Sequence, residues 1–251
     1  MNENTPIKIK KSPKEAIVNR LTCATLEGIS AKVIEVEATF TKGLPGFAVV
    51  GLASNDIQEA KERVKSSLLT NEFIFPPLKI TINLSPSDIK KNGTHFDLSL
   101  ALLIALNKYS FEEEGLFVFG ELGLDGRVKS SSLLFPLILS LKEQNVIKRA
   151  IVPKEAIKYL SRISGIDFMA VESLNEAIVL LKEGTFKSNV EKFSYDAKML
   201  SVNDKNYYYE EEYESDFLEV KGQSIAKRAS LISACECITF LWRETLVVVK
   251  V

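Results

Sequence analysis

Alternating apolar and polar residues predict a series of strands between residues 21 and 184. The pattern is clearest over residues 31–40 and 79–84, where apolar side chains recur as in a half-buried strand. Residues 47–52 form a short apolar strand after the turn-forming sequence Gly43-Leu-Pro-Gly46. Further strands are predicted over residues 116–122, 127–130, 150–152 and 168–171, and Asp125-Gly126 predicts a hairpin turn between the first two of these.

Helical periodicity separates several of these strands. A first helix begins after an N-cap at Ser54 or Asn55, and its exposed side offers Glu59 and Arg63 as an i,i+4 ion pair. Its apolar face consists of Ile57, Ala60, Val64 and Leu68. Helices are also predicted over residues 96–107, 133–143, 154–160 and 174–182. Strands that alternate with helices predict an α/β (α+β) layer structure.

Composition divides the chain into five segments. Its 251 residues, at roughly 150 per domain, allow one sizeable domain and a smaller one. Residues 1–18 form a basic N-terminal arm, and residues 19–184 form the main domain. Residues 185–215 are an acidic linker that carries Tyr207–Tyr209. Residues 216–235 begin a new helical pattern, and residues 236–251 form a tail of different character.

The overall balance of residues excludes several classes of protein. Lys and Arg number 32 and Asp and Glu 33, so a net charge of −1 gives no strong general attraction to a polyanion. Apolar residues make up 46%, yet no run approaches the length of a membrane span, and the N-terminus has no signal-peptide pattern. The three cysteines predict no disulfide framework. We therefore expect a cytoplasmic protein without a membrane partner.

Candidate catalytic and metal-binding residues are few. The single histidine, His95, lacks an evident nucleophile and orienting carboxylate, so a helix-terminus or backbone contact is favoured over catalysis. Cys235 and Cys237 have the wrong spacing for zinc, which predicts no metal site. The Gly-x-x-Gly-x-x-Gly at residues 120–126 lacks the dinucleotide-binding spacing and fits a hairpin turn better.

A cluster of basic residues is the one candidate nucleic-acid interface. Its alternative is an ordinary solvated face, which is the commoner outcome for such clusters. The candidate residues are Lys61, Arg63, Lys65, Lys90 and Lys91.

Four ordered segments resemble the N-terminal domain of the ComM/YifB family, the magnesium-chelatase-like AAA+ ATPases of the competence-protein type. They read GLPGFAVVGLASNDIQEAKERVKSSL (43–68), KITINLSPSDIKKNGTHFDLSLAL (79–102), FGELGLDGRV (119–128) and RAIVPKEA (149–156). The resemblance implies a Lon-protease-like fold for residues 19–184. It places the Lon serine at His95 and the Lon lysine at Phe135, so it does not carry peptidase activity with it.

Residues 216–229 resemble the start of that family's ATPase domain, with Val220, Gly222 and Gln223 as a vestigial adenine-side segment. The family continues into a G-x-x-x-x-G-K-[ST] phosphate loop, which this chain lacks, so we expect neither ATP nor Mg²⁺ as a cofactor here. Read in the neighbouring frame after the loss of one base behind Cys235, residues 236–251 are compatible with GMHNILMEGNPGCGKS. This motivates the hypothesis of a frameshifted tail, which the nucleotide sequence would test.

The resemblance implies that full-length relatives form rings and move DNA branches during natural transformation. We therefore expect an accessory domain without enzymatic activity, with a homo-oligomer and DNA as candidate partners. One alternative is a diverged peptidase that uses Ser85, Ser87 or Ser99 with Lys90 or Lys91. The other is a free-standing nucleic-acid-binding module.

Overall fold

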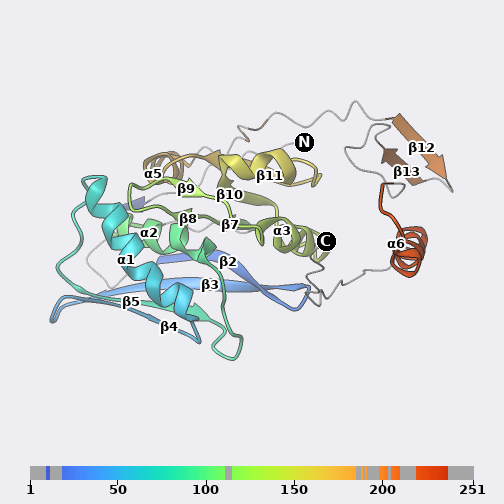
Figure 1. The fold of residues 1–251 in the computed structure, drawn as a ribbon. Helices are drawn as coiled ribbons and strands as arrows, with labels where there is room; N and C mark the ends of the chain where they lie inside the picture. The colour runs from blue at the N-terminus through green and yellow to red at the C-terminus, as the bar shows by residue number, and fades with distance from the viewer. Residues whose placement is uncertain are drawn as a thin grey trace. The chain divides into compact units, whose positions relative to one another are not determined.

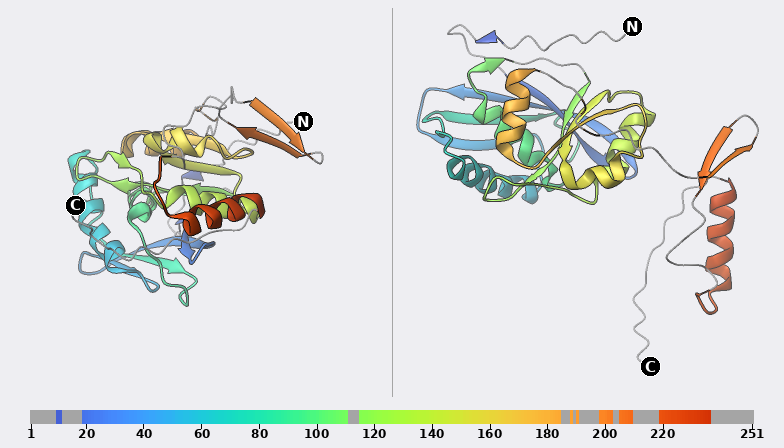
Figure 2. Two further views of the ribbon diagram at one scale, coloured as in Figure 1. Left: turned by 45° about the vertical axis from the view of Figure 1, so that its right-hand side comes forward. Right: turned by 90° about the horizontal axis from the view of Figure 1, so that it is seen from above.

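The protein is described by a computed structural model that places residues 10–11, 19–110, 115–184, 188, 190, 198–202, 205–209 and 219–236. The chain divides into two compact units, Met1–Phe193 and Ser194–Val251. Figures 1 and 2 show the elements of each unit. The candidate sites discussed below lie in the first unit, with the exception of the predicted adenine-side segment.

A seven-stranded mixed sheet forms the centre of the first unit, in the order β11-β10-β7-β2-β3-β5-β4. Strands β11, β10, β7 and β2 pair in parallel, and so do β4 and β5, whereas β3 is antiparallel to both of its neighbours. The bounds are β2 (Asn19–Glu27), β3 (Ser30–Thr41), β4 (Gly46–Val50), β5 (Lys79–Ser85), β7 (Leu116–Val118), β10 (Arg149–Pro153) and β11 (Asp167–Val171). The fold is therefore of the mixed α/β type, as predicted.

Two smaller strand pairs flank this sheet in the first unit. Strand β8 (Glu121–Leu122) pairs with β9 (Val128–Lys129) through the turn at Asp125 and Gly126, which confirms the predicted hairpin. Strand β1 (Lys10–Lys11) pairs with β6 (Tyr109–Ser110) and is the described part of the predicted basic arm.

Helices cover the sheet and bury its apolar side chains (Figure 1). Helix α2 contacts β2, β3, α1 and α5, while α3 contacts β2, β3 and α4. The helical segments are α1 (Asn55–Thr70), η1 (Thr94–Phe96), α2 (Asp97–Ala105), α3 (Leu134–Glu143), η2 (Lys154–Ala156), α4 (Ile157–Leu160) and α5 (Leu174–Glu183). The predicted apolar face of α1 is confirmed, because Ile57, Ala60, Val64 and Leu68 are all buried.

The sheet differs from the sequence prediction at two places. Strand β2, the longest after β3, was not predicted, although it lies between β7 and β3 in the middle of the sheet. The predicted strand 116–122 is two short strands, β7 and β8, because the chain leaves the sheet at Phe119–Gly120. Gly120 there donates its N–H to the carbonyl of His95.

The second unit contains a hairpin and one helix. Strand β12 (Lys198–Val202) pairs antiparallel with β13 (Lys205–Tyr209), so the segment predicted as a linker holds regular structure. Helix α6 (Ser224–Glu236) confirms the helical pattern predicted after residue 216. Residues 237–251, and with them nearly all of the tail in the frameshift hypothesis, lie outside the described residues.

Candidate functional site

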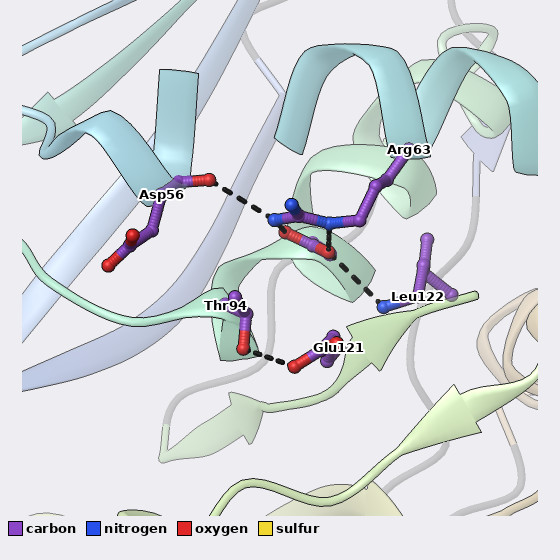
Figure 3. Close-up of polar contacts among 6 residues, drawn as sticks. Asp56, Arg63, Thr94, Glu121 and Leu122 are labelled. Atoms are coloured by element: carbon purple, nitrogen blue, oxygen red, sulfur yellow. Dashed lines mark hydrogen bonds and ion pairs between the residues drawn. The ribbon is translucent and has the colours of Figure 1, made fainter. Parts of the chain in front are cut away.

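Polar side chains from three elements meet where the chain enters α2 (Figure 3). The segment Gly93–Asp97 leads from the loop after β5 into η1 and α2, and Gly93 has a φ of 105°. Arg63 reaches this place from α1, and Glu121 and Leu122 reach it from β8. The site therefore joins α1, α2 and β8, and it includes the residue at which the family resemblance places a Lon-type serine.

The guanidinium of Arg63 forms a two-pronged ion pair with the carboxylate of Asp97. Arg63 Nε lies 2.7 Å from Asp97 Oδ2, and its second nitrogen, Nη2, lies 3.1 Å from Oδ1. The Asp97 side chain is 0% exposed and that of Arg63 22%. Asp97 Oδ2 also accepts the backbone N–H of Leu122 at 3.2 Å, and Arg63 Nη2 donates to the carbonyl of Asp56 at 3.1 Å. Parallel N–H···O bonds of this kind are strong and orient both partners.

Burial and pairing act in opposite directions on Asp97. Burial raises the pKa of Asp97 to about 6, while the bonds from Arg63 and from the Leu122 N–H lower it. The hydrogen bond to Asp97 raises the pKa of Arg63. The predicted Glu59–Arg63 pair is wrong, because the Arg63 guanidinium turns toward Asp97 across the helix interface. Nearby, the Thr94 hydroxyl donates to the carboxylate of Glu121 (Figure 3).

His95 is a buried residue in a wholly internal setting. Its Nε2 lies 2.8 Å from the carbonyl oxygen of Ala24 in β2, and we assign the proton to Nε2 because a carbonyl only accepts. The ring lies 4.7 Å from Phe96 and 6.0 Å from Phe119, centroid to centroid. Burial lowers the pKa of His95, so the imidazole is neutral. Its contact with a backbone carbonyl agrees with the role favoured from the sequence.

The residues of the peptidase alternative are not brought together. The hydroxyl of Ser99 is buried and donates to the carbonyl of Val118 at 3.0 Å, and Ser87 is exposed in the loop after β5. The Lys91 ammonium donates to the carbonyl of Pro86, so this lysine is engaged by the backbone. In the part of the chain that the structure describes, Ser85, Ser87 and Ser99 form no hydrogen bond with Lys90 or Lys91. A serine–lysine pair requires such a contact.

Phe135, at the position of the Lon lysine, lies on α3. Its ring packs edge-on against Tyr159 with centroids 6.4 Å apart. The side chain of Leu133, two residues earlier, approaches Gly93, since a Cβ built on Gly93 would lie 3.7 Å from Leu133 Cδ1. The two ends of the expected catalytic pair are therefore apolar or neutral.

The predicted basic patch loses two of its five members. Lys61 is half-buried and Lys65 exposed on α1, and Lys90 is exposed in the loop before η1. Arg63 is instead paired with Asp97, and Lys91 is 0% exposed, with burial lowering its pKa. These two residues cannot both keep their partners and contact a phosphate. The sequence carries no local signal for either partner, because each contact depends on how separate segments fold together.

The predicted adenine-side residues lie in the second unit. Val220, Gly222 and Gln223 are exposed and precede α6, and both Gly222 and Gln223 have left-handed backbones. Within the described ranges, no group of three or more His, Cys, Asp or Glu side chains is arranged to hold a metal ion. Among those same residues, no helix combines the length and apolar character needed to cross a membrane.

Comparison with known proteins places these features in context. Residues 36–156 match the family model described as subunit ChlI of Mg-chelatase. The competence protein ComM of Haemophilus influenzae is 28% identical over 210 residues, which are 82% of this chain and 39% of ComM. An uncharacterized protein of Mycobacterium tuberculosis is 31% identical over 171 residues, 67% of this chain and 34% of that protein. YifB of Escherichia coli is 38% identical over 105 residues, 41% of this chain and 21% of YifB. The chain thus spans about a third of the length of the curated relatives it matches.

Proposed function

The chain belongs to the ComM/YifB family of magnesium-chelatase-like proteins, and on that premise we propose that it acts as the N-terminal accessory part of a ComM-like AAA+ ATPase. The observation that carries the proposal is the match with ComM, which extends over 82% of this chain. The cytoplasm and DNA branch migration during natural transformation are the proposed setting, taken from the family resemblance.

The proposal includes the absence of ATP turnover by this chain. None of its 251 residues forms the G-x-x-x-x-G-K-[ST] loop whose backbone amides, lysine and hydroxyl hold nucleotide phosphates and Mg²⁺. Purified protein should release no phosphate from ATP in the presence of Mg²⁺ above the rate of a buffer control. Magnesium-dependent hydrolysis that co-purifies with the folded protein and survives a second chromatographic step would contradict the proposal.

The proposal also includes the absence of peptidase activity from a Lon-like domain. Its support is the pair His95 and Phe135, of which the first is a buried neutral imidazole and the second an apolar ring. Neither group can act as a hydroxyl nucleophile or as the amine that takes its proton. A fluorophosphonate probe should therefore leave the protein unlabelled, and labelling that Ser99→Ala removes would favour the diverged peptidase.

Self-association is the property we propose for an accessory domain of a ring-forming protein. Heterologous contacts between identical subunits close into rings when the rotation permits. Light scattering of the purified chain over a range of concentrations measures this directly. A mass that rises with concentration supports the proposal, while a strict monomer at every concentration removes assembly from its role.

Nucleic-acid binding is a second candidate function, favoured by the accessibility of Lys61, Lys65 and Lys90. Binding through phosphates weakens steeply with salt. The test is a gel shift of a branched DNA with the triple variant Lys61→Glu, Lys65→Glu, Lys90→Glu. A triple variant at the exposed Lys42, Lys129 and Lys158 is the matched control for net charge. Equal binding by wild type and both variants would exclude this interface.

A further inference from the structure

A cavity of about 850 Å³ opens in the first unit beside the ends of β10 and β11. Lys154 and Glu155 follow β10, Glu172 follows β11, and Arg127 and Lys129 approach from the β8–β9 hairpin. In α/β sheets, the carboxyl ends of parallel strands are where ligands bind. The volume also lies within the range of small-molecule sites. This cavity lies apart from the Arg63–Asp97 site and contains none of the basic residues singled out from the sequence.

The carboxylates of the cavity are already engaged within the protein. Glu155 accepts the backbone N–H of Ser130, and Glu172 forms an ion pair with Lys154. Glu176 Oε2 accepts the backbone N–H of Glu172 at 2.8 Å. Their negative charge is thus directed at donors in the cavity wall, which lowers the repulsion that an anionic ligand would meet.

The cations of the cavity keep unused donors. Lys154 has three N–H donors and pairs with one carboxylate oxygen, of Glu172. Arg127 has five donors and pairs through Nε with Asp125 Oδ2 at 3.2 Å. The Lys129 ammonium has no ion pair or hydrogen bond with any residue that the structure describes. Donors therefore exceed free acceptors around the cavity.

The N-terminus of α5 is not the source of this excess. Ser173 caps α5 by accepting the N–H of Glu176 at 3.3 Å, and the carboxylate of Glu176 returns to the N–H of Glu172. This capping-box arrangement satisfies the amide groups that an anion would otherwise use. The surplus donors are those of the Lys129, Lys154 and Arg127 side chains.

We propose that this cavity binds a phosphate group through Lys129, Lys154 and Arg127. A phosphate carries several acceptor oxygens and a charge that matches three converging cations around one cavity. The group is either that of a small phosphorylated molecule or that of a nucleic-acid backbone. The inference rests on the cavity alone and does not depend on the proposed accessory role.

Calorimetric titration with pyrophosphate, without added metal, tests the site. Wild type should bind saturably, and the double variant Lys129→Gln, Lys154→Gln should lose at least about tenfold in affinity, since each charged hydrogen bond contributes about 1.5–3 kcal/mol. Lys158→Gln together with Lys42→Gln is the control, because both are exposed lysines outside the cavity wall. No saturable binding by wild type, or equal losses in both double variants, would overturn the proposal.

A second measurement uses the opposite change of charge. Glu172→Gln frees the Lys154 ammonium, so pyrophosphate should bind more tightly, by up to about fivefold given the strength of exposed ion pairs. Asp167→Asn removes an equal charge at an exposed position outside the cavity wall and should leave the affinity unchanged. An equal gain in both variants would mean general electrostatic attraction and no site.

The source of the phosphate is resolved by repeating the titration with a single-stranded oligonucleotide. Oligonucleotide binding that Lys129→Gln, Lys154→Gln weakens identifies a backbone phosphate. Pyrophosphate binding that depends on these lysines, with oligonucleotide binding that does not, identifies a small ligand. Both outcomes support the cavity as a phosphate site. Unfolding curves of each variant exclude loss of the fold as the cause.

Discussion

The guanidinium of Arg63 meets the carboxylate of Asp97 with Nε and Oδ2 separated by 2.7 Å, and this contact joins α1 to the first turn of α2. Asp97 is fully buried, so its charge depends on Arg63 and on the N–H of Leu122. The same carboxylate thereby ties the β8–β9 hairpin to the helices. A charge buried in this way becomes costly when its partner is removed.

Arg63→Met should therefore destabilise the protein strongly. The variant keeps the length of the side chain but leaves the Asp97 carboxylate without its cation, and we expect a loss of about 3 kcal/mol in the free energy of unfolding. Lys65→Met, on the exposed side of the same helix, should change it by less than about 0.5 kcal/mol. Urea unfolding followed by circular dichroism measures both, and equal values would contradict a special role for the pair.

Asp97 should also make stability depend on pH. Its folded-state pKa, about 6, lies above the ordinary value of 3.8, so the folded state binds the proton more tightly than the unfolded state. The contribution of this group is therefore present at low pH and is lost as pH rises from about 4 to about 6. The free energy of unfolding of wild type minus that of Asp97→Asn should fall across this window.

The difference between these two proteins isolates Asp97 from other titrating groups. His95, whose pKa is lowered by burial, acts in the opposite direction, because its stabilisation is lost as pH falls below the ordinary value of 6.5. Its effect is shared by both proteins and largely cancels. Asp167→Asn, at an exposed position, is the control and should show no such trend relative to wild type. A difference that rises with pH would mean that the ion pair outweighs burial.

Gly126 should tolerate no side chain. Its φ is 85°, and a Cβ added there would lie 2.2 Å from Asn71 Nδ2, which donates to the carbonyls of Ser67 and Asp125. Gly28 also has a left-handed backbone, with a φ of 61°, but an added Cβ would meet no heavy atom within 4 Å. Gly28→Ala should cost about 1 kcal/mol, and Gly126→Ala more, because the amide must also move.

A double variant separates the two causes at Gly126. Asn71→Ala removes the colliding amide, so its own cost and that of Gly126→Ala should add to more than the cost of the double variant. The melting temperatures of the four proteins supply the cycle. Strict additivity would mean that backbone conformation alone explains the loss.

Neighbouring lysines should respond in opposite ways to charge reversal. Lys91 is fully buried and bonded to the carbonyl of Pro86, so Lys91→Glu should cost more than about 3 kcal/mol and abolish folding in a marginal background. Lys90 is exposed, and Lys90→Glu should change stability by less than about 0.5 kcal/mol. Thermal unfolding of the two variants decides this. A folded Lys91→Glu variant with native stability would contradict the burial of this side chain.

Much of the fold follows from local patterns that the sequence displays. Alternation in β3 and β5 and the 3.6-residue period in α1 survive in the structure because each pattern matches one buried face. Strand β2 was missed because its buried residues include Asn19, Cys23 and Thr25, which do not contrast with polar neighbours. The same holds for Lys91, whose side chain is buried despite its charge.

The sequence by itself determined the family, the mixed α/β class, the hairpin turn at Gly126 and the apolar core face of α1, since short segments carry these signals. Only the tertiary structure decided that Arg63 meets Asp97 and not Glu59, that Lys91 is buried, and that Lys129 and Lys154 border one cavity. The reason is physical. Periodicity reports which face of a segment is buried, whereas the partner of a charge depends on which distant segments the packed sheet and helices bring within a few ångströms.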